Sequence, residues 1–336
     1  MITGRDNQTM QEATKFTPSL QVTLNAALGP MGIIRAQGAD VIKFLQGQLT
    51  QDVALLGLSQ ARLAAWCSAK GRMSASFVVL KNTHEDILLL CSASVLPATL
   101  KRLQMFVLRA QCKLSDATAL FTVHGLAGDA ATAFTPSALS IWSLGRINDK
   151  TYVQLPHGVH LGSQVPRVLC IEAVVGDSAA ALGAIDQGDD TAHQLALWQY
   201  LEVSTGIAAI TAPIVDAFVP QMLNYESVGG VNFKKGCYPG QEVVARSQFR
   251  GTLKRRAYVV SSDAPLAAGQ EVFDNRAPEQ PCGMVASAGP QPGTSHWLAV
   301  VSMQTSAADS PGLSVLSIDG PALQLQTLPY ALLDDI

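Results

Sequence analysis

The most telling segment of the chain covers residues 234–242 and reads Lys234-Lys235-Gly236-Cys237-Tyr238-Pro239-Gly240-Gln241-Glu242. Its two glycines permit backbone conformations that other residues avoid, and its proline presets a first helical turn. The pattern predicts a short strand over residues 231–233, a tight turn and then a helix. Cys237 would lie just ahead of the helix N-terminus and beside two lysines, and both features favour a thiolate. The segment offers Cys237 as a reactive thiol, against the alternative of a small buried side chain.

Length and composition indicate a globular protein of more than one domain. The chain has 336 residues, so two or three domains are expected. No apolar run reaches the length that a membrane span needs, and residues 1–16 lack the apolar core of a secretory signal. We expect a cytoplasmic protein with no membrane association, preceded by a flexible tail over residues 1–20.

The six cysteines stand singly along the chain, at Cys67, Cys91, Cys112, Cys170, Cys237 and Cys282. There is no C-x-x-C or H-E-x-x-H motif, so no metal site is predicted. Scattered single thiols fit a reducing compartment.

Hydrophobic patterns predict an α+β architecture. Residues 30–115 alternate strand and helix signals, with a hairpin of two strands over 74–80 and 86–92. Asp40 is a candidate N-cap for a helix whose apolar face extends to Leu49.

The second half of the chain changes character twice. Residues 120–181 read as strands, and a helix over 192–203 is expected to end at Gly206. Beyond residue 250, short alternating runs separated by turn residues are typical of a small barrel or sandwich.

Basic residues gather between positions 234 and 256. Seven of the 23 lysines and arginines lie there: Lys234, Lys235, Arg246, Arg250, Lys254, Arg255 and Arg256. Such asymmetry in an acidic chain is typical of contact with an anionic partner, and a solvated face or a domain junction is the alternative.

These residues resemble the YgfZ family, the folate-binding relatives of the glycine-cleavage T-protein, an aminomethyltransferase. The central match is Lys235-Gly236-Cys237-Tyr238-x-Gly240-Gln241-Glu242, with Arg246 and Arg250-Gly251 after it. Further matches follow the expected order: Phe44-Leu45-Gln46-Gly47-Gln48-Leu49-Thr50-x-Asp52-Val53, Lys70-Gly71-Arg72-Met73, Phe218-Val219-Pro220-Gln221, Gly229-Gly230-Val231-x-Phe233 and Leu328-Pro329-Tyr330. The resemblance extends from about residue 30 to the end of the chain.

The resemblance implies an α+β fold in which three domains form a T-protein-like ring, with mostly antiparallel sheets, helices and a small C-terminal β-barrel. Residues 21–115 together with 190–250 would form a discontinuous folate-binding domain. Residues 116–189 would form a second α+β domain packed on it, and residues 251–336 the barrel.

The resemblance also implies tetrahydrofolate or a derivative, such as a polyglutamylated one, as cofactor. Trp198 stands where the family has a folate-stacking tryptophan, although core packing is the commoner role for such a side chain. Met31 holds the place of a second tryptophan. Cys237 and Lys235 are the candidate catalytic residues. Other candidate cofactor contacts are Lys70, Arg72, Asn224, Tyr238, Gln241, Glu242, Arg246 and Arg250; for Asn224, a role in orienting buried backbone is the alternative.

The implied function is support of iron–sulfur cluster assembly or repair, and thereby of tRNA modification. Iron–sulfur proteins or their assembly factors are the expected partners besides folate, and direct nucleic-acid binding is not expected. The alternative is a folate-dependent aminomethyl or one-carbon transferase, or a demethylase. Aminomethyltransferases carry an aspartate pair where this chain has Gly71-Arg72-Met73-Ser74-Ala75, and without an acid there the proton for the leaving amine lacks a donor.

Overall fold

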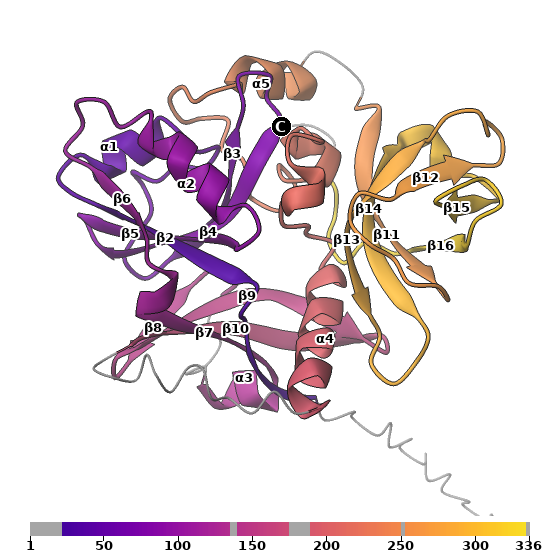
Figure 1. The fold of residues 1–336 in the computed structure, drawn as a ribbon, viewed down its shortest axis with the longest axis horizontal. Coiled ribbons are helices and arrows are strands. Elements are labelled where there is room, and N and C mark those ends of the chain that lie inside the picture. The colour runs from indigo at the N-terminus through magenta and orange to yellow at the C-terminus, as the bar shows by residue number, and fades with distance from the viewer. Residues whose placement is uncertain (1–21, 135–139, 175–188, 250–252, 334–336) are drawn as a thin grey trace, which may run out of the picture.

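The computed structural model describes residues 22–134, 140–174, 189–249 and 253–333. Figure 1 shows two sheets with their helices on one side of the molecule and a barrel on the other. The long helix α4 (Asp189–Val203) stands between them. Every strand pairing in the three sheets is antiparallel, which confirms the expected α+β class.

The first sheet has the strand order β3-β4-β5-β2-β6. Its strands are β2 (Met31–Gln37), β3 (Ala61–Cys67), β4 (Met73–Thr83), β5 (Asp86–Ser92) and β6 (Lys113–Asp116), and two helices accompany it, α1 (Val41–Gln46) and α2 (Leu96–Gln104). The predicted hairpin is confirmed, because β4 and β5 pair up to Thr83 and Asp86. Asp40 is the N-cap residue of α1, as predicted, but its carboxylate makes no cap bond and instead accepts from the backbone N–H of Gln111 at 2.8 Å.

The second sheet has the order β1-β7-β10-β9-β8. Its strands are β1 (Thr23–Ala27), β7 (Phe121–Gly128), β8 (Leu144–Ile147), β9 (Lys150–His160) and β10 (Ser163–Ala173), with the short helix α3 (Asp129–Phe134) beside them. Strand β1 comes from the N-terminal segment yet pairs with β7. The division into domains stays a prediction, and the pairing of β1 ties its first segment to the second sheet.

The C-terminal part is a closed barrel, as the alternating runs predicted. Its strands follow the order β11 (Arg255–Ser262), β14 (Trp297–Gln304), β13 (Gly283–Pro290), β12 (Glu271–Asp274), β15 (Leu313–Val315) and β16 (Ala322–Gln326). Its interior is filled mainly by valines and leucines, with two alanines, Cys282 and Met303.

Helix α4 joins the three parts. The helix was expected over residues 192–203 and is observed from Asp189 to Val203. Beyond its end, the backbone N–H of Gly206, at a φ of +69°, donates to the carbonyl of Val203 and closes the last turn. Its buried residue Leu201 shares a core with side chains of both sheets. Its other side meets β13 so closely that a Cβ on Gly289 would lie 2.8 Å from the backbone of Gln199.

The segment after α4 is built from turns and not from a strand. Residues 231–233 form no ladder, so the strand predicted there is wrong. The backbone N–H of Asn232 donates to the carbonyl of Thr50, and the hydroxyl of Thr50 donates to the carbonyl of Gly230. These bonds to one loop residue replace the pairing that a strand would need. Among the described residues, no helix is long and apolar enough to cross a membrane.

Candidate functional site

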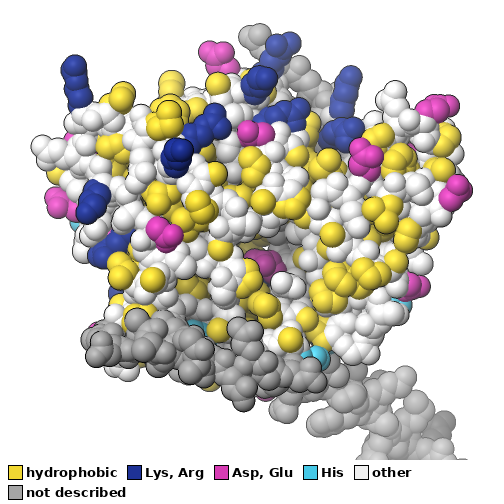
Figure 2. All heavy atoms as spheres, in the orientation of Figure 1, with side chains coloured by type: hydrophobic (Ala, Val, Ile, Leu, Met, Phe, Trp, Pro, Cys, Tyr) yellow, Lys and Arg dark blue, Asp and Glu magenta, His cyan; other side chains and the backbone are white. Residues whose placement is uncertain are grey.

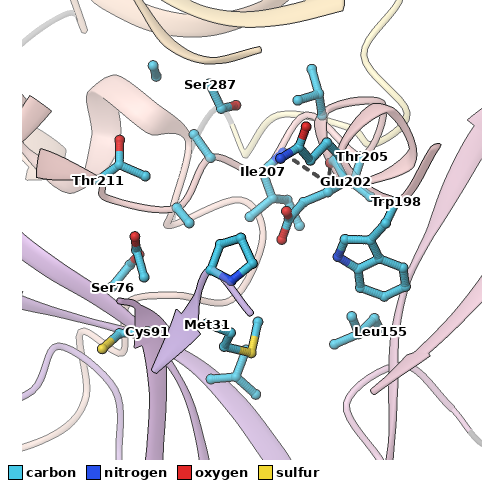
Figure 3. A pocket seen from close by; sticks show the side chains of 18 of the residues that line it. Met31, Ser76, Cys91, Leu155, Trp198, Glu202, Thr205, Ile207, Thr211 and Ser287 are labelled. Carbon is cyan, nitrogen blue, oxygen red and sulfur yellow. Dashed lines mark hydrogen bonds between the residues drawn. The ribbon is translucent and has the colours of Figure 1, made fainter. Parts of the chain in front are cut away.

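A cavity of about 470 Å³ lies where the two sheets, α4 and the barrel meet. Figure 2 shows the surface hollowed near its centre, and Figure 3 shows the cavity from close by. Most of its wall is apolar, and its lining includes Met31, Phe77, Leu155, Arg167, Trp198, Glu202, Ala286 and Ser287. Both sheets, α4 and the barrel therefore all contribute residues to the lining of this one cavity.

Trp198 reaches this cavity from α4. Its side chain is 3% exposed and belongs to a core cluster, so it packs in the interior and also forms part of the cavity wall. The indole lies against Gly125 of β7, where an added Cβ would come within 2.5 Å of the ring. Only a glycine at position 125 leaves room for the ring in this place.

Met31, the first residue of β2, also lines the cavity. It stands at a boundary, because it also lines a neighbouring cavity of about 660 Å³. The structure thus brings Met31 and Trp198 to the same space, although 167 positions separate them in the chain.

Two charged residues in the wall were missed by the sequence analysis. Arg167 of β10 is 2% exposed, and its guanidinium carbon lies 4.3 Å from the centre of the Trp198 ring. Its Nε and Nη2 have no hydrogen-bond partner among the described residues. Burial lowers the pKa of this guanidinium to about 10.

Glu202 is the nearest acid to that guanidinium. Its Oε1 is 4.0 Å from Nη2 of Arg167, beyond hydrogen-bond length, and its side chain is 43% exposed. Figure 3 shows the carboxylate directed into the cavity. Desolvation raises the pKa of the Glu202 carboxyl. Each of these two residues is a lone charge within an apolar stretch of sequence. That pattern was the signal by which the sequence analysis could have found them.

The Cys237 segment lies outside this cavity lining. Cys237 is exposed, and α5 (Gln241–Phe249) begins four positions after it. Lys235 is buried, and its ammonium donates to the carbonyls of Gln46 and Leu49 at 2.5 Å each. Lys235 therefore binds the last turn of α1, and burial lowers its pKa to about 8. The ring of Tyr238 is buried and its centre lies 5.0 Å from that ammonium.

Lys70 and Arg72 belong to the turn between β3 and β4, beside the Cys237 segment. Lys70 is exposed, and Arg72 donates to the carbonyl of Ala217. Gly71 of this turn touches Gly240, where a Cβ would lie 2.6 Å from the Gly71 nitrogen. Trp198 and Met31 thus lie at the cavity, whereas Lys70 and Arg72 lie beside the Cys237 segment.

The remaining predicted contacts are on or beyond α5. Gln241 is half-buried at the start of this helix, while Glu242 and Arg246 are exposed on it. Arg250 lies outside the described residues.

Asn224 is fully buried, away from both cavities. At a φ of +55°, it donates to the carbonyl of Ala257 and accepts from the N–H of that residue. It also donates to the hydroxyl of Tyr330 at 3.2 Å. Its amide therefore orients buried backbone at the junction with the barrel, as the alternative for this residue stated. Among the described residues, no group of three or more potential ligands could hold a metal ion.

The architecture, two antiparallel sheets and a closed barrel around a central cavity, is that of the aminomethyltransferase T fold. The fold is similar to aminomethyltransferase T of the glycine cleavage system from Bartonella henselae, with a TM-score of 0.63 over 91% of this chain and 86% of that chain at 18% identity.

Sequence similarity gives the family. The chain is 31% identical over 319 residues to the tRNA-modifying protein YgfZ of Sodalis glossinidius (strain morsitans), covering 91% of this chain and 92% of that protein. It is 29% identical to the tRNA-modifying protein YgfZ of Photorhabdus laumondii, over 94% of both chains. No family model matches the chain. The chain belongs to the YgfZ family.

Proposed function

We propose that this protein binds tetrahydrofolate in the central cavity and supports iron–sulfur cluster assembly or repair in the cytoplasm, and thereby tRNA modification. The family membership supports the last step, since the relatives are named tRNA-modifying proteins. The observation that carries the proposal is a mostly apolar cavity walled by Trp198, with the carboxylate of Glu202 directed into it.

The cavity fits a folate in size and chemistry. Its volume of about 470 Å³ lies within the range of small-molecule sites, which is roughly 300–1,000 Å³. Its apolar side chains, among them Met31 and Leu155, suit a flat ring system, and the carboxylate of Glu202 suits the polar edge of that ring. When bound, tetrahydrofolate would supply one-carbon chemistry.

Cys237 is the group we propose for contact with iron–sulfur proteins. Its exposure on the surface allows a partner to reach the thiol. Lys235 fixes the backbone next to it by binding the end of α1. In this proposal the cavity and the thiol surface are separate parts of one protein, joined through the turn that contains Lys70 and Arg72.

Folate-dependent one-carbon transfer is the second candidate, and Glu202 favours it. Among the described residues, Glu202 is the carboxylate in the cavity wall, and desolvation raises the pKa of its carboxyl, the direction that a proton donor to a leaving amine needs. Turnover of glycine or sarcosine to methylene-tetrahydrofolate, lost in Glu202→Gln, would establish this activity. An absence of turnover with both donors would exclude it.

Two measurements test the leading proposal. Calorimetric titration with tetrahydrofolate should give saturable binding to the wild type and at least tenfold weaker binding to Trp198→Ala. In a strain that lacks this protein, Cys237→Ser should fail to restore iron–sulfur enzyme activity, whereas Cys112→Ser, which alters a half-buried thiol elsewhere, should restore it. Absence of tetrahydrofolate binding, or full rescue by Cys237→Ser, would refute the respective half of the proposal.

A further inference from the structure

A group of exposed apolar side chains follows helix α2. Met105, Phe106 and Leu108 are 69%, 45% and 88% exposed, and they lie within four consecutive positions. Single exposed apolar residues are ordinary on a protein surface, but several large ones together are typical of a contact site. We call these three residues the 105–108 tip.

The chain holds this tip in place from within and from behind. Between its exposed residues, Val107 packs against the core of the first sheet. Just after the tip, the backbone N–H of Gln111 donates to the carboxylate of Asp40 at 2.8 Å, and the N–H of Asp40 donates to the carbonyl of Gln111 at 3.1 Å. A surface whose shape is fixed before contact loses less entropy when a partner binds.

The tip is joined to the Cys237 segment through Trp66 and the turn after α1. The ring centres of Phe106 and Trp66 are 6.4 Å apart. Trp66 forms a β-bridge with Leu49, and the carbonyl of Leu49 accepts from the ammonium of Lys235, two positions before Cys237. Figure 1 shows α2 and the segment that leads into α5 on the same upper part of the molecule. The tip and the exposed thiol therefore flank one small part of the structure.

The charges in this part of the structure have one sign. Residues 41–51, 96–112 and 231–241 contain no acid, and their six basic residues are Lys43, Lys101, Arg102, Arg109, Lys234 and Lys235. All of these except Lys235 are exposed. Figure 2 shows lysine and arginine side chains gathered over the upper part of the molecule. In a chain with a net charge of −3, such a local excess attracts an acidic partner.

The acids that border these stretches offset little of this charge. Asp52 is 7% exposed, and the carboxylate of Asp40 is bonded to the backbone of Gln111. Glu242 of α5 is exposed. One exposed acid against five exposed bases leaves the surface positive.

We propose that the 105–108 tip and the basic residues beside it are the docking surface for an iron–sulfur protein or assembly factor whose contact face is apolar at its centre and acidic around it. Docking there brings the partner to Cys237. The two most exposed side chains of the tip, Leu108 and Met105, are aliphatic. An apolar centre with a charged rim is typical of protein interfaces, whereas single-stranded nucleic acid is bound by stacking on aromatic rings. The inference rests on the proposed role of Cys237 and adds the surface and the kind of partner.

Photocrosslinking in cells tests this surface directly. The probe is p-benzoylphenylalanine in place of Leu108 in the full chain, and the control carries it in place of Leu161, which is 64% exposed between β9 and β10. At position 108 we expect adducts that mass spectrometry identifies as acidic iron–sulfur proteins or assembly factors, and at position 161 none of these. Arg102→Glu should lower the adduct yield about tenfold, because it replaces attraction by repulsion next to the apolar contact.

Rescue of iron–sulfur enzyme activity, in a strain that lacks this protein, is the second measurement. Loss of an apolar contact at the centre of an interface weakens binding by about tenfold or more, so Leu108→Asp at native expression should restore less activity than the wild type. Leu161→Asp should restore it fully. Both leucines are exposed, so both variants should keep the thermal melt and the tetrahydrofolate affinity of the wild type.

The outcomes separate the docking surface from the proposed function. Full rescue by Leu108→Asp, together with failure of Cys237→Ser, would overturn the docking surface while the role of the thiol stands. Adducts at position 108 with RNA or lipid alone, with basic proteins, or with nothing would overturn it as well. Full rescue by Cys237→Ser would instead refute the thiol function on which the inference rests.

Discussion

Gly71 and Gly240 touch backbone to backbone, and this contact joins two motifs that lie far apart in the sequence. A Cβ on Gly240 would lie 2.6 Å from both the nitrogen and the Cα of Gly71. Both glycines have positive φ, +69° at Gly71 and +76° at Gly240. The turn before β4 and the loop that presents Cys237 therefore depend on each other for their shape.

Alanine at Gly240 should destabilise the protein. The new methyl group meets the Gly71 backbone, and the positive φ strains any L-residue, which together cost roughly 1–3 kcal/mol or more. Urea denaturation measures the loss in free energy of unfolding. Gly236→Ala in the same loop is the matched control, because a Cβ there meets nothing within 4 Å. Equal unfolding midpoints for the two variants would contradict this reading of the contact.

Alanine at Gly125 should displace Trp198 from its place. The added Cβ would come within 2.5 Å of the indole, so the ring must shift in the cavity wall. We expect a blue- or red-shifted tryptophan fluorescence and at least tenfold weaker tetrahydrofolate binding. Gly29→Ala, where a Cβ meets nothing within 4 Å, should leave both unchanged. Wild-type fluorescence and affinity in Gly125→Ala would show that the ring has room to spare.

Cys237 should react with alkylating reagents before the buried cysteines. It is exposed, whereas Cys67 and Cys91 are buried and burial raises the pKa of each thiol to about 12. Only the thiolate is nucleophilic, so these two should stay unmodified in the folded protein near neutral pH. Mass spectrometry over time gives the order, and Cys237→Ser should remove the first adduct. An unchanged first adduct in that variant would identify a different reactive thiol.

The stability of the protein should depend on pH through Lys235. Burial lowers the pKa of its ammonium from the ordinary 10.5 to about 8. Between these values the unfolded chain binds more protons than the folded one, so the Lys235 contribution to stability rises with pH. The difference in unfolding free energy between the wild type and Lys235→Met should therefore shift in favour of the wild type from pH 8 to pH 10. Denaturant titrations at a series of pH values measure it, and parallel profiles would refute a buried ammonium at this position.

Local patterns were sufficient where a structure depends on short-range periodicity or a single turn. The β4–β5 hairpin, the end of α4 at Gly206 and the strands of the barrel follow from alternation, a cap glycine and turn residues. The predictions were incomplete or wrong where a distant partner decides. Asp40 bonds to Gln111 in place of the helix end, and residues 231–233 bond to a loop in place of a strand.

The segment around Cys237, together with the other matched segments, was enough to indicate the family, and it offered a reactive thiol because glycine conformations and charge are properties of neighbouring residues; that Cys237 is exposed came from the structure. Only the tertiary structure decided what each lysine, arginine and tryptophan faces. It buried Lys235 against α1, turned the Asn224 amide to the backbone of Ala257 and placed Arg167 over Trp198 with Glu202 nearby. The reason is physical: the environment of a charged side chain is set by the elements packed around it, and those come from both sheets, α4 and the barrel.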